Sequence, residues 1–188
     1  MELVLRREII VNKSLCRITG ALIFIIMTAL GAFVRIPLPF TPVPITLQTF
    51  FVLLSGLFLG SSLGASSQIG YIFLGVAGLP IFTAAGSGLL YLAGPTTGYL
   101  IGFILAAFFT GTFIKNARNS FFGAFCVICA ADFILLFSGV IWLKLIFGYS
   151  FGKLLLIGMA PFIPGDLIKA LAAAFIYLKL KNRIKEVF

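Results

Sequence analysis

Residues 120–143 read SFFGAFCVICAADFILLFSGVIWL, and this stretch decides the class of fold. It is 24 residues long, and Asp132 is its only charged residue. A bilayer core about 30 Å thick needs about 20 helical residues to cross it. The stretch therefore predicts a membrane-spanning helix rather than a segment of a soluble domain.

The composition of the whole chain agrees with this prediction. Of its 188 residues 61% are hydrophobic and 10% are charged, and the mean hydropathy is +1.19. A soluble domain carries roughly 45–50% apolar and about 25% charged residues. The chain also lacks histidine, the commonest general base at neutral pH, and has only five acidic residues. The composition indicates an integral membrane protein and argues against an enzyme.

Further apolar stretches extend the prediction to an all-α bundle of six transmembrane helices in a single domain, residues 1–188. The predicted spans are 18–35, 46–60, 65–79, 90–114, 120–143 and 163–179. The second and third are short for a crossing, and such boundaries hold to a few residues. We expect the basic N-terminal stretch to belong to an uncleaved first helix rather than to a signal peptide.

Basic residues predict the orientation of these spans. They gather before the first span, between the fourth and fifth at Lys115 and Arg118, and after the sixth. Cytoplasmic ends of membrane spans are enriched in Lys and Arg. Six crossings bring all three clusters to one side, so both termini are predicted to be cytoplasmic. The net charge of +9 therefore indicates topology, and we expect no nucleic-acid binding because no soluble face presents the charge.

Three segments rich in Pro or Gly fall on the opposite, outer side in this topology. They are residues 37–44, 79–91 and 148–164. Irregular backbone at membrane depth is tolerated only where it is buried in protein or lines a cavity. The segments either build and cover a binding pocket or are ordinary connecting turns, and the pattern alone leaves both open.

Glycines repeat every four residues in two of the predicted spans. Such spacing predicts a helix face on which backbones approach closely, either within the bundle or as a docking face for another membrane protein. The two sets are Gly56, Gly60 and Gly64, and Gly94, Gly98 and Gly102.

Cys126 and Cys129 form a CxxC inside the apolar run of residues 120–143. Cysteine packs as a small hydrophobe in such surroundings. We therefore expect a packing role rather than redox or metal chemistry, and no cofactor or metal.

Asp166 and Lys169 are the most informative charges, because charged residues inside a span are costly and commonly mark a ligand or ion site. Positions three apart share one helix face, so the two side chains can meet. Pro164 suits the first turn of a helix, which places Asp166 near the helix N-terminus, where an anion is favoured. The pair either contacts a ligand or pins the last helix to its neighbours. Asp132, the other intramembrane acid, could pair with Lys169, bind substrate or take a proton.

Three motifs, in order along the chain, resemble those of the BioY family, the biotin-specific S-components of energy-coupling-factor transporters. The first is Pro37-Leu-Pro-Phe-Thr-Pro-Val-Pro-Ile-Thr-Leu-Gln48. The second, Gly75-Val-Ala-Gly-Leu-Pro-Ile-Phe82, runs into Ser87-Gly88 and Gly94-Pro-Thr-Thr-Gly-Tyr99. The third is Pro164-Gly-Asp-Leu-Ile-Lys169. The resemblance extends from about Ala21 to Ala174, nearly the whole chain.

The resemblance implies a six-helix S-component fold in a bacterial inner membrane, with a biotin pocket open to the outside. In the family the Asp and Lys of the last motif contact biotin, and here these are Asp166 and Lys169. A carboxylate can accept from the ureido N–H groups while an ammonium donates to the ureido carbonyl. Biotin would be a transported ligand and not a prosthetic group. Tyr71, Tyr91 and Phe82 are candidates for the walls around its apolar parts, and Gln48, which ends the first motif, is a further candidate contact.

Two departures from the family pattern concern the outer loop and the first helix. Many members carry an Arg in the Gly-rich loop, where this chain reads Gly86-Ser87-Gly88, and Arg35 is a candidate substitute for holding the biotin carboxylate. The small-residue motif by which the family's first helix docks on its membrane partner is interrupted by Ile25, between Ala21 and Ala29.

The resemblance also implies partners, namely an energising module of one membrane coupling subunit and two ATPases, besides membrane lipids. The chain has no phosphate-binding glycine loop followed by Lys and Ser or Thr, so we do not expect it to hydrolyse ATP. One alternative is a stand-alone or proton-coupled carrier, for which Asp132 is the motivating residue, although no inverted repeat is apparent. Another is a non-transport scaffold, suggested by the glycine faces.

Overall fold

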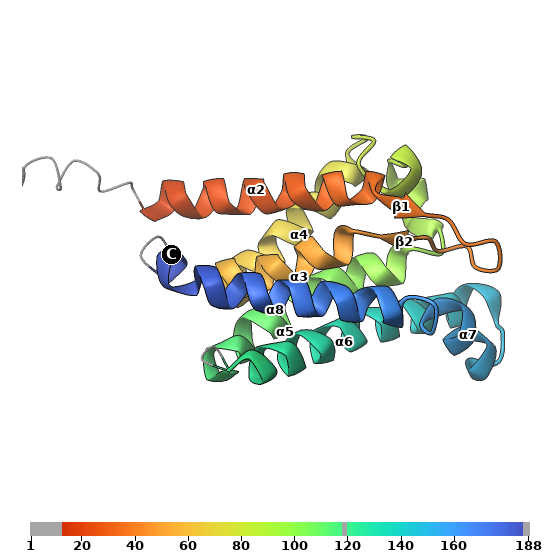
Figure 1. Ribbon diagram of the computed structural model, residues 1–188. Helices are drawn as coiled ribbons and strands as arrows, with labels where there is room; N and C mark the ends of the chain where they lie inside the picture. The colour runs from red at the N-terminus through yellow and green to blue at the C-terminus, as the bar shows by residue number, and fades with distance from the viewer. Residues whose placement is uncertain (1–12, 118–119, 186–188) are drawn as a thin grey trace, which may run out of the picture.

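The computed structural model describes residues 13–117 and 120–185, most of which are helical (Figure 1). The α-helices are α2 (Lys13–Phe33), α3 (Gln48–Leu59), α4 (Ser61–Val76), α5 (Thr97–Ala117), α6 (Phe121–Phe147), α7 (Phe151–Gly158) and α8 (Ile163–Lys185). Two short strands, β1 (Arg35–Ile36) and β2 (Ile45–Thr46), pair antiparallel between α2 and α3. Two 3-10 helices, η1 (Thr83–Ala85) and η2 (Leu89–Ala93), lie between α4 and α5.

The long helices run side by side along one axis, and successive ones alternate in direction. Figure 1 shows the start of α2 and the end of α8 at one end of the bundle. The strand pair and α7 lie at the other end, together with the segment between α4 and α5. We call this second end, formed by residues 34–47, 77–96 and 148–162, the loop end. The three irregular segments predicted to share one side do share one end of the bundle.

Three helices are long and apolar enough to cross a membrane: Leu15–Phe33, Thr97–Ala117 and Phe121–Phe147. The pair formed by α7 and α8, bent by 53°, passes the same test as a unit. By length and composition the described residues therefore contain three spans, or four with the bent pair. Helix α3, with 12 residues, is only about 18 Å long, in line with the short second span that the sequence predicted.

Helices α3 and α4 form a tight hairpin around Gly60, whose φ of +81° is the left-handed backbone that glycine adopts readily. A Cβ on Gly64 would come within 3.0 Å of the Gly56 Cα, so the two helices are in backbone contact just beyond the turn. The prediction that Gly56, Gly60 and Gly64 share one helix face is therefore wrong. Gly60 ends one helix and begins the next, so the other two glycines face each other.

Helix α5 is the central helix, packed against α3, α4 and α6. Of the residues in its apolar stretch 61% are buried, whereas the share in the α2 span is only 22%. Helix α2 therefore lies at the periphery with its apolar side chains facing outward. Gly98 and Gly102 abut the α6 backbone at Ser138 and Leu135, where an added Cβ would meet their carbonyl oxygens at 2.6 and 2.8 Å. These glycines serve packing within the bundle.

Several of the predicted helix boundaries need correction. The span expected from residue 90 begins at Thr97, because Pro95 cannot donate a backbone hydrogen bond and Gly94 is extended. Helices α6 and α8 continue past residues 143 and 179. The predicted spans ended where lysines interrupt the apolar stretches, but the helices do not, because lysine is a good helix former. The eight-residue helix α7 was expected to be irregular.

Candidate ligand-binding site

A cavity opens at the loop end between α3, α4, α5, α6 and α8. Its empty volume is about 520 Å³, including the open space at its mouth. Apolar and aromatic side chains make up most of its walls, with a small number of polar groups at defined places. Small-molecule sites in proteins commonly have this composition.

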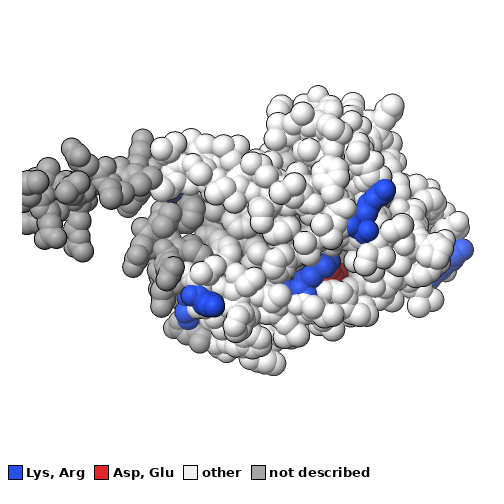
Figure 2. Space-filling view, turned by 45° about the horizontal axis from the view of Figure 1, so that its top comes forward, with Lys and Arg blue, Asp and Glu red and all other residues white. Residues whose placement is uncertain are grey.

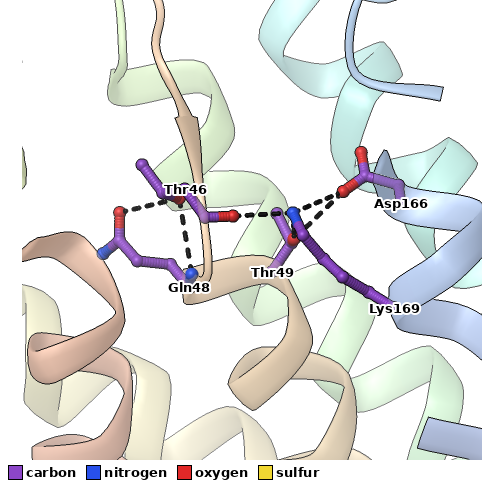
Figure 3. A network of polar contacts seen from close by, with 5 residues as sticks. All are labelled: Thr46, Gln48, Thr49, Asp166 and Lys169. Carbon is purple, nitrogen blue, oxygen red and sulfur yellow. Dashed lines mark hydrogen bonds and ion pairs between the residues drawn. The ribbon is translucent and has the colours of Figure 1, made fainter. Parts of the chain in front are cut away.

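The first polar group of the cavity is centred on the Lys169 ammonium (Figure 3). Its Nζ donates to Asp166 Oδ1 at 2.8 Å, to the Thr46 carbonyl at 2.6 Å and to Thr49 Oγ1 at 2.9 Å. The Thr49 hydroxyl donates in turn to Asp166 Oδ1 at 3.2 Å. The side chains of Lys169 and Asp166 are 12% and 5% exposed, so the ion pair is largely removed from solvent. On the face drawn in Figure 2, the acidic patch that is visible lies directly against a basic side chain, in a surface with few other charges.

Local sequence places each member of this cluster. Helix α8 begins at Ile163 with Pro164 in its first turn, and the Asp166 N–H donates to the Phe162 carbonyl at 2.9 Å. Lys169 follows three residues later and therefore lies on the same helix face. Strand β2 brings the Thr46 carbonyl to the ammonium just before α3 begins.

Gln48 and Tyr71 form a second polar group on another wall. Gln48 Nε2 donates to the Tyr71 hydroxyl at 2.6 Å, and this hydroxyl donates to the Ile81 carbonyl at 3.0 Å. Gln48 Oε1 accepts from the hydroxyls of Thr83 at 3.3 Å and Thr46 at 3.4 Å. These bonds tie the start of α3 to the end of α4 and to the loop that follows it.

An aromatic wall stands beside this second group. The rings of Phe82 and Tyr91 are stacked with centroids 4.6 Å apart, and Tyr71 meets Phe82 edge-on at 5.6 Å. Gly75 lies against the Phe82 ring and Gly86 against the Tyr91 ring, so a side chain at either glycine would displace the wall.

One oxygen of Asp166, a residue of the cavity wall, has no hydrogen-bond partner among the described residues. This oxygen, Oδ2, is buried. A buried acceptor without a partner costs about 1–3 kcal/mol, and more when it is charged. The arrangement can therefore accept a hydrogen bond from an N–H or O–H group of a ligand.

Six of the residues singled out in the sequence line the cavity together: Gln48, Tyr71, Phe82, Tyr91, Asp166 and Lys169. Gly86, Ser87 and Gly88 lie beside it and are not part of its lining. Ser87 is exposed, and Gly88, with φ of +81°, turns the chain between η1 and η2. Arg35 is exposed and lines an outer hollow that shares Pro44, Thr83, Tyr91 and Thr96 with the cavity.

Sequence reasoning missed both threonines of the Lys169 cluster. Thr46 lies in the Pro-rich motif and Thr49 directly follows it, and a hydroxyl in the apolar stretch predicted as the second span was the available signal. It also missed the walls formed by Tyr99 and Phe103 of α5 and Leu136 of α6, which the apolar pattern does not distinguish from other core residues.

The chain matches the model of the BioY family over residues 7–186. A biotin transporter BioY of Thermotoga maritima is 37% identical over 160 residues, which cover 85% of this chain and 92% of that protein. A probable biotin transporter BioY of Pyrococcus horikoshii is 36% identical over 162 residues, covering 85% and 93%. A biotin transporter BioY of Rhizobium etli is 36% identical over 167 residues, covering 83% and 87%.

A solved structure has the same fold. The crystal structure of the S-component for biotin from an ECF-type ABC transporter superposes with a TM-score of 0.85 and 28% sequence identity, covering 92% of this chain and 94% of that one. Apolar helices that can cross a membrane fit a membrane protein of this kind. The chain therefore belongs to the BioY family.

Proposed function

We propose that this chain takes up biotin as the substrate-binding S-component of an energy-coupling-factor importer, and that it is not an enzyme. The observation that carries the proposal is the buried Asp166–Lys169 pair with its unused Asp166 oxygen, at the wall of a cavity in a BioY-family chain. Biotin has two ureido N–H donors, and Oδ2 of Asp166 accepts from one of them.

Lys169 orients Asp166, and it contacts the ligand by replacing one of its present hydrogen bonds with a bond to the ligand. An ammonium has three protons, and all three are engaged, by Asp166, Thr46 and Thr49. A ureido carbonyl can receive one of them only if a present acceptor is displaced. Thr49 is the easiest to displace, because its hydroxyl loses only the acceptor role and keeps its own bond to Asp166.

Arg35 holds the carboxylate at the end of the valerate chain. It lines the hollow that continues the cavity outward past Tyr91. It also pairs with Thr46 across the β1–β2 ladder, so its backbone is held by the strand that binds Lys169. The rings of Tyr71, Phe82 and Tyr91 pack against the apolar parts of the ligand. Gly86, Ser87 and Gly88 shape the loop around these rings.

Six helices cross the bacterial inner membrane, with both termini in the cytoplasm. Helices α2, α3, α4, α5, α6 and α8 alternate in direction, and the cavity end then faces outside. Short α3 and α4 are accommodated as a hairpin packed on α5, rather than each spanning lipid alone. A coupling subunit and two ATPases supply the energy that releases biotin inward.

Equilibrium binding of biotin to the purified, detergent-solubilised chain tests the proposal. We expect saturable binding that Asp166→Ala and Lys169→Ala each weaken at least tenfold, about 1.4 kcal/mol. Lys153→Ala is the control, because Lys153 lies over the Tyr149 ring of the same end and not in the cavity. A folded wild-type chain that binds no biotin overturns the proposal.

A proton-coupled carrier is the second candidate, favoured by the buried Asp132 Oδ1, which has no hydrogen-bond partner in the described part of the chain. Uptake of labelled biotin by cells that contain this chain, with and without the coupling subunit and ATPases, separates the two. Uptake by the chain alone that collapses with the proton gradient supports the carrier. Uptake that requires the ATPases supports the S-component.

A further inference from the structure

Asp132 is a buried acidic residue. It lies on α6 and is 7% exposed, and its Oδ1 is buried with no hydrogen-bond partner among the described residues. It lines a groove between α6 and α8 that has about 480 Å³ of empty space, including its open side. Asp166 lines the same groove, and its Oδ2 is the other buried oxygen without a partner. Two buried carboxylates thus border one hollow, each with one oxygen that no described residue contacts by a hydrogen bond.

The charges around Asp132 do not balance if it is ionised. Asp166 and Lys169 of α8 act on it electrostatically, and these two already neutralise each other as an ion pair. Cys129, one turn earlier on α6, is its titratable neighbour on the same helix. Helix α5 carries Lys115 in its last turn, near the start of α6, and Asp132 lies about 16 Å along α6 from that start. An ionised Asp132 would therefore leave one negative charge uncompensated among the described residues.

The groove favours a proton over a metal cation as the compensating charge. Its other walls are apolar, among them Phe133, Met159 and Leu167. Hard cations such as Ca²⁺ and Mg²⁺ require about six or more oxygen ligands, whereas two carboxylates are the acidic groups that line this groove. A proton needs one donor oxygen and one acceptor, directly or through a water.

We propose that Asp132 and Asp166 form a proton-binding site, in which Asp132 is a neutral carboxylic acid whose hydroxyl donates to the free oxygen of Asp166, directly or through one water. The bond accounts for the unpartnered oxygen of Asp166 and removes the uncompensated charge of Asp132.

The site shares Asp166 and Leu136 with the ligand cavity. If biotin N–H groups donate to Asp166 Oδ2, they compete with the Asp132 hydroxyl for one acceptor. Binding free energies are reciprocal, so a proton that weakens biotin binding is itself bound more weakly when biotin binds. This consequence rests on the proposed function, whereas the protonated state of the empty protein does not.

Infrared spectroscopy of the ligand-free protein at pH 7, in a detergent without ester groups, tests the site. We expect a carboxylic-acid carbonyl band that shifts in D₂O and is lost in Asp132→Asn. Cys129→Ala, which removes a thiol from the same groove, keeps the band. Absence of the band from the folded wild-type protein overturns the proposal, and this outcome does not depend on the variant folding. A band that persists in Asp132→Asn also overturns it.

Biotin binding supplies a second readout. We expect protons to be released into a weakly buffered solution when biotin binds to the wild type, and the release to be lost in Asp132→Asn, which still binds biotin. Binding by the wild type without proton release overturns the competition for Asp166. Absence of biotin binding contradicts the proposed function and does not affect the infrared test of the proton-binding site.

Discussion

Thr49 of α3 and Asp166 of α8, 117 residues apart in the sequence, are joined by a hydrogen bond of 3.2 Å between Oγ1 and Oδ1. The same hydroxyl accepts from Lys169 Nζ at 2.9 Å. A residue of another helix therefore bonds to both members of the charged pair of α8, and these bonds hold α3 and α8 together at the cavity. A buried ion pair is costly to desolvate and gains stability only when further hydrogen bonds satisfy its atoms. Thr49 and the Thr46 carbonyl supply such bonds.

Thr49→Val keeps the shape of the side chain and removes the hydroxyl. Lys169 then loses one acceptor and Asp166 loses one donor, each bond contributing about 1 kcal/mol. We expect the melting temperature without biotin to drop and biotin affinity not to fall, because biotin displaces the Thr49 hydroxyl from Lys169 in the wild type. Both are measured in detergent by fluorescence-monitored unfolding with and without biotin. Thr112→Val is the matched control, because the exposed Thr112 bonds only to the Phe108 carbonyl of its own helix. Equal effects in both variants contradict the role given to Thr49.

Arg35→Gln tests whether Arg35 binds the biotin carboxylate. A hydrogen bond to a charged group contributes about 1.5–3 kcal/mol when buried, and less at an exposed residue such as this one. We expect the variant to bind biotin several-fold more weakly, and to bind biotin amide, which lacks the carboxylate charge, as the wild type does. Competition binding measures, for each of the two ligands, the ratio of the variant's dissociation constant to that of the wild type. Lys153→Gln, at the same end of the bundle, leaves both affinities unchanged. A parallel loss for the amide shows that Arg35 acts on the fold and not on the carboxylate.

The parts of the site that lie close in sequence were predictable. Asp166 and Lys169 are three residues apart on a helix that Pro164 begins, so their contact follows from helix geometry. The three irregular segments were expected on one side from the charge pattern alone, and they share the loop end. Rows of apolar residues were enough to indicate the class of fold.

The contacts between distant segments were not predictable. Nothing in the local pattern of Thr46 or Thr49 says that they will meet α8, because both contacts span more than a hundred residues. The hairpin at Gly60 was not predicted, because glycines spaced four residues apart also fit one face of a continuous helix. Its sharp turn depends on one backbone angle, which composition does not reveal.

Tyr71→Phe tests the second polar group. The Tyr71 hydroxyl is fully buried between Gln48 Nε2 and the Ile81 carbonyl, and its loss leaves a donor and an acceptor unsatisfied. Each buried unsatisfied group costs about 1–3 kcal/mol. We expect a lower melting temperature in the absence of biotin, and an affinity loss if the loop after α4 shifts. Tyr149→Phe, on the loop end but outside the cavity, is the control. An unchanged melting temperature contradicts the structural role of this bond.

Gly56→Ala tests the packing of the α3–α4 hairpin on α5. The added Cβ would collide with the Ala107 carbonyl and lie 2.9 Å from the Thr110 Cβ, and neither can move without shifting α5. Overpacking of this kind costs about 1–3 kcal/mol. Gly152→Ala is a matched change in a helix, because a Cβ there meets nothing within 4 Å, and it gains about 0.5–1 kcal/mol from helix propensity. We expect the melting temperatures to move in opposite directions. Biotin affinity should fall only in Gly56→Ala, since α3 carries Thr49 and Gln48 into the cavity. An unperturbed Gly56→Ala would mean that the hairpin lies further from α5 than the structure places it.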